Sequence, residues 1–467
     1  MNIHMSKIYN IEKMSKSNKS FMYTSSFTAT LGGLLFGFDT AVISGTIPFI
    51  TKHFQLSDAM LGWAVSSALI GCIIGSATIG KPGDIYGRRF ILKILALLFL
   101  ISAIGSALST SLNVFVIFRF IGGLAIGGAS VLSPLYISEI APAKLRGRLV
   151  SISQLAIVSG ILLSFFSNYL LINTGENNWR WMFFAGAVPA LAFFILLFFI
   201  SQSPRWLVMV GKPEEAKEVI SRLNSGENIV AEMEEINQSI NKGIVHMSFF
   251  VLFKKPYLKV VLIGLTVGML GALTGINTIM YYAPIIFQSV GFSSDSALFQ
   301  TVCMGAMNLI FTLIGMSLID KIGRKFLLMA GAIGMSAFLF LIFLTLNFGW
   351  FGSYALLVCI LGYQAVFAST MGVVIWVLLS EMFPNNIRAR ASSICSFTNW
   401  VFNATISFLF PVIIGLFGAN PLGNRTGLGF VFAFYSIITF VSFFFYRKYL
   451  VETKGKSLEE LEKLVLK

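Results

Sequence analysis

The sequence predicts an all-α membrane protein in which twelve transmembrane helices form two halves of six. Three observations support this prediction. Of the 467 residues, 56% are hydrophobic and only 12% are charged, whereas about 25% charged residues is usual in soluble proteins. Twelve apolar stretches are long enough to cross a bilayer, which takes about 20 helical residues. Two loop motifs also recur in the same order, once in each half.

The polar segments between these stretches divide the chain. The predicted spans lie at 27–50, 59–80, 91–111, 113–136, 149–172, 181–200, 258–287, 297–319, 326–347, 351–379, 392–417 and 427–446. A transmembrane β-barrel would show short alternating strands instead. The insertion after the sixth span contains PEEAKEVISRL and VAEMEEINQSI, which have the spacing of amphipathic helices. We therefore predict an N-terminal tail at 1–24, a six-helix bundle at 25–200, a helical linker at 201–256, a second bundle at 257–447 and a tail at 448–467.

The basic residues are distributed unevenly along the chain, which has a net charge of +14. If the N-terminus is cytoplasmic, only Lys52, Arg180 and Arg425 fall in external loops, and Arg119 falls inside a span. This bias sets orientation in membrane proteins, so the charge indicates cytoplasmic termini and not a nucleic-acid partner. The four cysteines all lie in apolar spans, and we predict neither a disulfide nor a metal site.

Two motifs link the halves. D-x-x-G-R-[R/K] begins at Asp84 and again at Asp320, and S-E-x-x-P-x-x-[L/I]-R-x-R begins at Ser138 and again at Ser380. Matched pairs in the same order indicate a duplicated six-helix unit, a transporter architecture with its site between the halves. We predict a cytoplasmic gating network, with ion pairs across the halves, made of Asp84, Arg88, Glu139, Arg146, Arg148, Asp320, Arg324, Glu381, Arg388 and Arg390. The alternative is that these charges only signal topology and form weak surface ion pairs.

Asp39 is the one acidic residue well inside a span. A charged side chain at that depth costs about 2.5–3.5 kcal/mol, so it indicates a functional site. Arg119, inside the fourth span, is its predicted partner, and the pair is the predicted site of proton coupling. Arg119 could instead reach the outer interface, and the pair could be purely structural.

Several further motifs resemble the major facilitator superfamily and, within it, the sugar porter family. These are Pro134-Leu-Tyr-Ile-Ser-Glu139, Gly275-Ile-Asn277, Tyr281-Tyr282-Ala-Pro284 and Glu452-Thr-Lys-Gly455. The likeness is greatest to bacterial xylose-type sugar/proton symporters. It implies alternating access, in which two bundles rock about a central site, and a protonatable Asp at the position of Asp39 paired with Arg119.

The resemblance also implies substrate contacts in the spans. Amide groups and aromatic rings suit sugars, because sugars present hydroxyl groups around a mildly apolar ring. The candidates are Phe36, Gln154, Asn277, Tyr281, Trp376, Asn399 and Trp400. Each of the amides could instead join neighbouring helices, and Trp400 could serve packing alone.

The chain departs from the sugar porter pattern at four places, one of which is the lack of the usual proline in Gly372-Val-Val-Ile-Trp376. Gly271 and Ala272 stand where the family usually has a Gln pair, and Ile161 stands at another common Gln position. We therefore expect a less polar cavity that is roomier near the seventh span. Gln202 replaces a common Glu, which we expect to weaken one cytoplasmic contact.

The leading hypothesis is a proton-coupled symporter of the bacterial inner membrane that imports a sugar, a polyol or a related small solute. We expect a monomer in the lipid bilayer that uses no cofactor besides the proton. A facilitative carrier of the same fold, or a carrier of a non-sugar organic solute, remains the alternative. An enzyme is disfavoured because the spans hold no catalytic cluster. The sequence does not name the solute.

Overall fold

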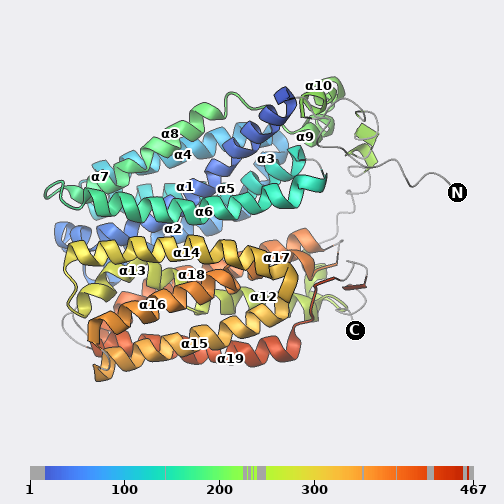
Figure 1. The fold of residues 1–467 in the computed structure, drawn as a ribbon. Coiled ribbons are helices and arrows are strands. Elements are labelled where there is room, and N and C mark those ends of the chain that lie inside the picture. Colours follow the sequence, from blue (N-terminus) through green and yellow to red (C-terminus); the bar gives the residue numbers. More distant parts are fainter. Residues whose placement is uncertain are drawn as a thin grey trace.

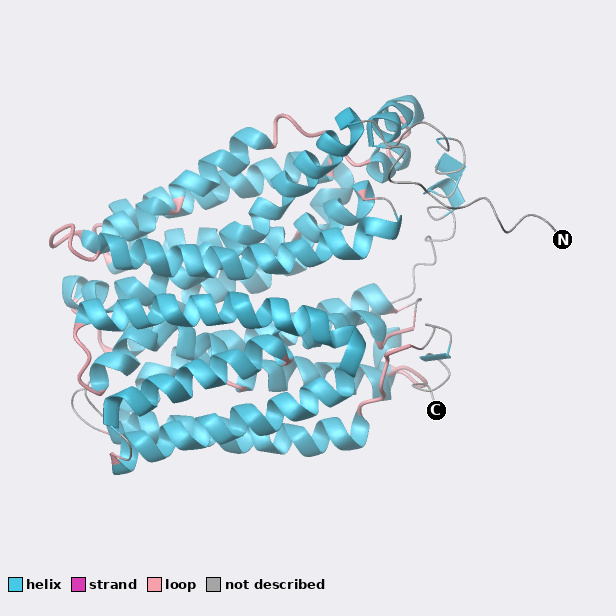
Figure 2. Cartoon of the chain, viewed as in Figure 1, coloured by secondary structure: helices cyan, strands magenta, loops and turns pink. Residues whose placement is uncertain are grey.

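The computed structural model describes residues 16–141, 143–223, 229, 233–234, 236–238, 249–349, 352–384, 387–417, 425–455 and 460–461. Helices make up almost all of this part of the chain (Figure 2). Twelve segments of it are long and apolar enough to cross a membrane. The predicted all-α fold with twelve spans is confirmed.

The first six spans form one bundle, drawn in the upper half of Figure 1. They are α1 (Lys16–Phe54), α2 (Asp58–Thr78), α4 (Arg88–Leu108), α5 (Leu112–Ile140), α6 (Ala143–Leu171) and a sixth span made of α7 (Asn178–Ala185) and α8 (Ala187–Leu196). The short helix α3 (Gly80–Tyr86) lies between α2 and α4. Helix α1, which carries Asp39, packs against both α5 and α6, and this places Asp39 inside the bundle.

The second bundle repeats this arrangement in the lower half of Figure 1. Its members are α12 (Leu258–Leu273) with α13 (Ile276–Ser289), α14 (Ser294–Ile322), α15 (Arg324–Phe348), α16 (Gly352–Ser369) with α17 (Met371–Glu381), α18 (Arg388–Leu416) and α19 (Arg425–Tyr449). Helix α15 packs against α16 and α19 on the side of this bundle away from the first half (Figure 1). Helices α14 and α18 face the first half, where they contact α6 and α2.

The linker begins with α9 (Pro204–Met209) and α10 (Pro213–Leu223), and η2 (Phe249–Phe253) precedes the second bundle. The segment PEEAKEVISRL forms α10, whose Ala216 and Ile220 pack on Leu207 while its charged residues are exposed. Most of VAEMEEINQSI lies outside the described residues. Helix α10 is therefore an amphipathic helix whose apolar side chains pack on α9.

The two ends of the molecule differ. We call the end at which α1 begins and α19 ends the basic end, because Arg88 and Arg324 lie there. At the other end, which we call the opposite end, the halves approach closely. A Cβ at Gly62 of α2 would overlap the carbonyl oxygen of Phe408 of α18, so this contact requires a residue without a side chain.

The seventh span is broken at Gly275. This residue has φ 80°, in the left-handed region, and its missing Cβ leaves room for the ring of Tyr435. The break interrupts the helical hydrogen bonds, and the hydroxyl of Tyr363 donates to the freed carbonyl of Thr274 at 2.9 Å. Broken helices with exposed backbone groups are common at the substrate sites of transporters.

Candidate functional site

Asp39 and Arg119 meet inside the first bundle. Arg119 Nη1 donates to Asp39 Oδ1 at 2.9 Å, and Arg119 Nη2 donates to the backbone carbonyl of Asp39 at 3.1 Å. Both residues are buried, and Arg119 is 1% exposed. The side chain of Arg119 therefore does not extend to the membrane surface. The predicted pairing of Asp39 with Arg119 agrees with the positions of the two residues.

The second carboxylate oxygen of Asp39 lies beside α5. A Cβ at Gly122 would stand 2.9 Å from Asp39 Oδ2, so the glycine keeps this oxygen uncrowded. Oδ2 is buried and accepts no hydrogen bond from the described part of the protein. Burial disfavours a charged carboxylate and Arg119 favours it, so Oδ2 is the atom at which a proton can bind without first displacing a donor.

Aromatic rings from the two halves face each other near the middle of the spans. The ring centroids of Phe36 on α1 and Trp400 on α18 lie 5.8 Å apart. The two planes are inclined by 46°, so the rings do not stack on each other. These two candidate residues form a direct aromatic contact between α1 and α18, and aromatic faces of this kind can pack on a sugar ring.

A chain of amides ties α13 to α18. Asn277 Nδ2 donates to Asn403 Oδ1 at 2.8 Å, and Asn403 Nδ2 donates to Asn399 Oδ1 at 2.9 Å. Asn399 Nδ2 donates in turn to the carbonyl of Gly268 at 2.9 Å. The structure therefore brings the candidates Asn277 and Asn399 together through Asn403, which the sequence analysis did not identify.

The other candidate substrate residues are not joined to this chain. Gln154 on α6 is half-buried and Trp376 on α17 is 43% exposed. Neither makes a side-chain hydrogen bond within the described ranges. Tyr281 on α13 is buried, and α13 packs against α1 of the first half. Their roles in binding remain predictions.

The expectation of extra room near the seventh span is wrong at Gly271. A Cβ there would lie 2.7 Å from Ile375 Cδ1 and 3.6 Å from Asn399 Nδ2. Ile375 of α17 therefore fills the space that a larger side chain on α12 would occupy.

At the basic end of the first half, Arg88 connects two acidic groups. Its Nη2 lies 2.9 Å from Asp84 Oδ1 and its Nε lies 3.1 Å from Glu139 Oε2. Gly87, with φ 92°, begins α4, and Gln202 Oε1 accepts from the backbone N–H of Arg89 at 3.1 Å. Gln202 thus caps the start of α4 with a neutral amide.

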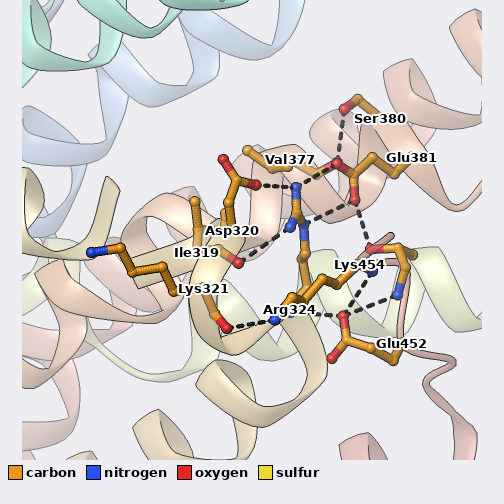
Figure 3. A network of polar contacts seen from close by, with 10 residues as sticks. Ile319, Asp320, Lys321, Arg324, Val377, Ser380, Glu381, Glu452 and Lys454 are labelled. Carbon is orange, nitrogen blue, oxygen red and sulfur yellow. Dashed lines mark hydrogen bonds and ion pairs between the residues drawn. The ribbon is translucent and has the colours of Figure 1, made fainter. Parts of the chain in front are cut away.

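The second half repeats this network around Arg324 (Figure 3). Arg324 Nη2 lies 2.9 Å from both Asp320 Oδ1 and Glu381 Oε1. The hydroxyl of Thr453 donates to Glu381 at 2.6 Å. Glu452 occupies the place that Gln202 has in the first half, accepting from the backbone N–H groups of Arg324 at 2.9 Å and Lys325 at 3.0 Å.

Glu452 is held as a carboxylate by its neighbours. Burial raises its pKa, but four backbone N–H groups outweigh burial and hold the pKa of Glu452 below its usual value. The donors are those of Lys454, Arg324, Lys325 and Thr453. The cap of α15 is therefore negatively charged, whereas the cap of α4 is neutral.

The predicted pairing across the halves differs from the observed one. Each basic-end ion pair that the structure describes joins residues of one half, because Arg88 and Arg324 each bind acids on helices of their own bundle. Arg388 donates to the carbonyl of Phe383, and Arg390 is half-buried on α18. Arg146 and Arg148 lie on α6, and their side chains fall outside the described residues.

Sequence reasoning also missed Glu452 and Thr453 as members of the basic-end network, and it did not identify the buried amides Asn308 and Gln364. Asn308 and Gln364 are amides buried in otherwise apolar helices, and this cost is the signal that could have found them. Glu452 and Thr453 follow the last span, far in sequence from the loop that they cap. Within the described ranges, no group of His, Cys, Asp and Glu is arranged to hold a metal ion.

Comparisons with known proteins agree with this architecture. The family described as sugar (and other) transporter matches residues 25–465. The D-xylose-proton symporter of Escherichia coli strain K12 is 39% identical, with 96% of each chain covered. The arabinose-proton symporter of Bacillus subtilis strain 168 is 38% identical, with 98% of each covered.

Among solved structures, the inward-open conformation of the xylose transporter XylE from E. coli matches with a TM-score of 0.83 and 36% identity. The match covers 95% of this chain and all of that one. The relatives are sugar-proton symporters and not enzymes, and the fold is that of the major facilitator superfamily. The predicted family is confirmed: the chain belongs to the sugar (and other) transporter family and is a multi-pass membrane transporter.

Proposed function

We propose that this protein imports a sugar together with a proton and that Asp39 carries the proton. The observation on which this rests is the buried Asp39–Arg119 pair with Oδ2 left without a described donor. Relatives that are 38–39% identical over nearly the whole chain are symporters of D-xylose and arabinose with protons. A pentose is therefore the first substrate to test.

Coupling follows from how a proton changes the pair. Protonation of Oδ2 removes the negative charge opposite Arg119 and weakens the bond from Nη1 to Oδ1. The bond from Nη2 to the backbone carbonyl of Asp39 does not depend on that charge. Binding of a proton thus changes the relative stability of two arrangements of α1 and α5, while the remaining bond holds the helices together. A change of this kind is what shifts a two-state equilibrium.

The arrangement of the two halves supports alternating access. The halves touch closely at the opposite end, where Gly62 meets Phe408. At the basic end the described ion pairs stay within each half, so the halves can part there without breaking them. We assign this form to the inward-facing state, which agrees with the match to an inward-open structure.

We further propose that the protein is a monomer in the bacterial inner membrane, with the basic end and both termini in the cytoplasm and no cofactor besides the proton. The excess of Lys and Arg at the basic end supports this orientation. Thr174 and Glu214 are exposed at the two ends. In right-side-out vesicles, Thr174→Cys should react with a membrane-impermeant maleimide, and Glu214→Cys should react only after the membrane is permeabilised.

The test of symport is the proton movement that accompanies sugar. In lightly buffered cells that express the protein, D-xylose or L-arabinose should raise the external pH, and a protonophore should abolish sugar accumulation. Accumulation that survives the protonophore would exclude proton symport. Equilibration of the sugar across the membrane without any pH change would favour the facilitative carrier. If neither pentose is taken up, hexoses, polyols and non-sugar solutes should be screened by thermal shift, because a bound ligand stabilises the protein.

A further inference from the structure

Gln364 is a buried amide without partners. Its side chain on α16 is 0% exposed, and neither Oε1 nor Nε2 forms a hydrogen bond within the described part of the protein. A buried polar group in this condition is destabilising and calls for an explanation. Asn168, a buried amide in the first half, differs because its Nδ2 donates to the carbonyl of Val42 at 3.2 Å.

The helix geometry of α16 shows which way Gln364 points. A Cβ at Gly362 would meet the ring of Phe338, and a Cβ at Gly334 would meet the side chain of Val366, so positions 362 and 366 face α15. Residues two apart lie about 160–200° apart around a helix. Gln364 therefore points away from α15 and is buried in the second half, where α16 also packs against α13 and α14.

The depth of Gln364 is set by its neighbour. The hydroxyl of Tyr363 donates to the carbonyl of Thr274 at 2.9 Å. Thr274 directly precedes the break at Gly275, and Asn277 lies on the first turn of α13 beyond it. The amide of Gln364 thus lies at the level of the helix break, close to the depth of the Asn277–Asn403–Asn399 chain.

Near this depth α12 carries Gly271 and Ala272 and therefore contributes no side-chain amide. Gln364 supplies a donor and an acceptor from α16 instead, and a sugar hydroxyl can pair with both kinds of group. We propose that Gln364 binds one hydroxyl group of the transported sugar and thereby determines specificity. This inference rests on the proposed function and adds a residue that distinguishes one hydroxyl position from the others.

The test combines a side-chain change with substrate analogues. Gln364→Met keeps the length of the side chain and removes its hydrogen-bonding groups. In the wild type, one of the monodeoxy derivatives of D-xylose should bind roughly tenfold more weakly than D-xylose, because its missing hydroxyl leaves the amide unpaired. In Gln364→Met, D-xylose itself should weaken by a similar factor, and that analogue should bind as well as D-xylose does.

Stability without sugar separates binding from a structural role. Removing an unpaired amide should leave the Tm of the sugar-free protein unchanged or higher, while the rise in Tm on adding D-xylose should shrink. The control Asn168→Leu should lower the Tm of the sugar-free protein and preserve discrimination among the deoxy analogues. If Gln364→Met proves unstable, Gln364→Leu carries the same test.

The possible failures are distinct. If the wild type binds sugar and Gln364→Met keeps the full affinity and the same discrimination among analogues, the inference about Gln364 is overturned while sugar transport stands. If the wild type binds no sugar, the proposed function and this inference fall together. Loss of affinity for every analogue by one common factor, with discrimination unchanged, would also contradict the assignment of Gln364 to a single hydroxyl.

Discussion

Arg119 holds Asp39 twice, by the carboxylate at 2.9 Å and by the backbone carbonyl at 3.1 Å. One guanidinium therefore joins α5 to α1 through a contact that depends on the charge of Asp39 and another that does not. The Arg119 guanidinium also lies 5.5 Å from the ring of Phe183, within the range of a cation–π contact. This environment keeps the arginine in place whether or not Asp39 is charged.

Removal of the arginine should destabilise the first bundle. Arg119→Met leaves a buried carboxylate without its counterion, and breaking a buried pair costs about 3–5 kcal/mol. We expect a clear fall in the unfolding midpoint of the purified protein in detergent. The double variant Asp39→Asn/Arg119→Met, which buries no lone charge, should recover much of the loss. Equal stability of Arg119→Met and the wild type would show that the pair does not carry this energy.

The two helix-start glycines should be intolerant of a side chain. Gly87 and Gly323 have φ of 92° and 102°, and an added Cβ would lie 2.6 Å from Gln202 and 2.7 Å from Glu452 respectively. With ψ of 149° and 158°, both lie in a region of backbone angles that is essentially limited to glycine, and holding a residue with a Cβ there costs on the order of 1–3 kcal/mol. We expect Gly87→Ala and Gly323→Ala to lower the unfolding midpoint. Gly80→Ala is the matched control, because nothing lies within 4 Å of its Cβ, and a comparable loss there would contradict this account.

The cap of α15 should depend on pH and the cap of α4 should not. A negative charge at a helix N-terminus stabilises by about 0.3–1 kcal/mol, so Glu452→Gln should lower the unfolding free energy by that order at pH 7. Because the pKa of Glu452 is held below its usual value, this contribution is complete above the ordinary glutamate range and is lost as the pH falls below it. The difference between Glu452→Gln and the wild type should therefore vanish in acid.

The reciprocal change tests the same idea in the first half. Gln202→Glu places a carboxylate at the start of α4, where Gln202 accepts from the N–H of Arg89. It should add stability at pH 7 and lose that gain in acid, as measured by thermal unfolding across pH. A pH-independent effect of either substitution would mean that charge at these caps is unimportant.

Much of the fold could be predicted because it depends on local and energetic signals. Span length and apolarity identify the twelve segments, and the cost of burying Asp39 and Arg119 identifies the pair before its distance is known. The duplicated motifs predicted a six-helix unit that occurs twice. These inferences need only composition, periodicity and the energetics of burial.

The remainder depends on contacts between distant segments. The motifs could not show which acids Arg88 and Arg324 bind. Ion pairs within one half and ion pairs across the halves would be made by the same residues. The filling of the space at Gly271 by Ile375, and the capping of α15 by Glu452, join residues more than 100 positions apart. Nothing in the sequence distinguishes Gln364 from the other amides in the spans, because its complete burial without a described hydrogen-bond partner depends on packing.

Proton-driven accumulation by an Asp39→Asn variant tests the central claim most directly. Purified protein in liposomes, with the outside made acidic, should concentrate D-xylose when wild type. Asp39→Asn should exchange labelled for unlabelled sugar at a comparable rate, since its site is intact, yet it should not accumulate sugar under the same gradient. Accumulation by Asp39→Asn that still follows the imposed pH gradient would contradict the assignment of Asp39 as the proton-coupling residue.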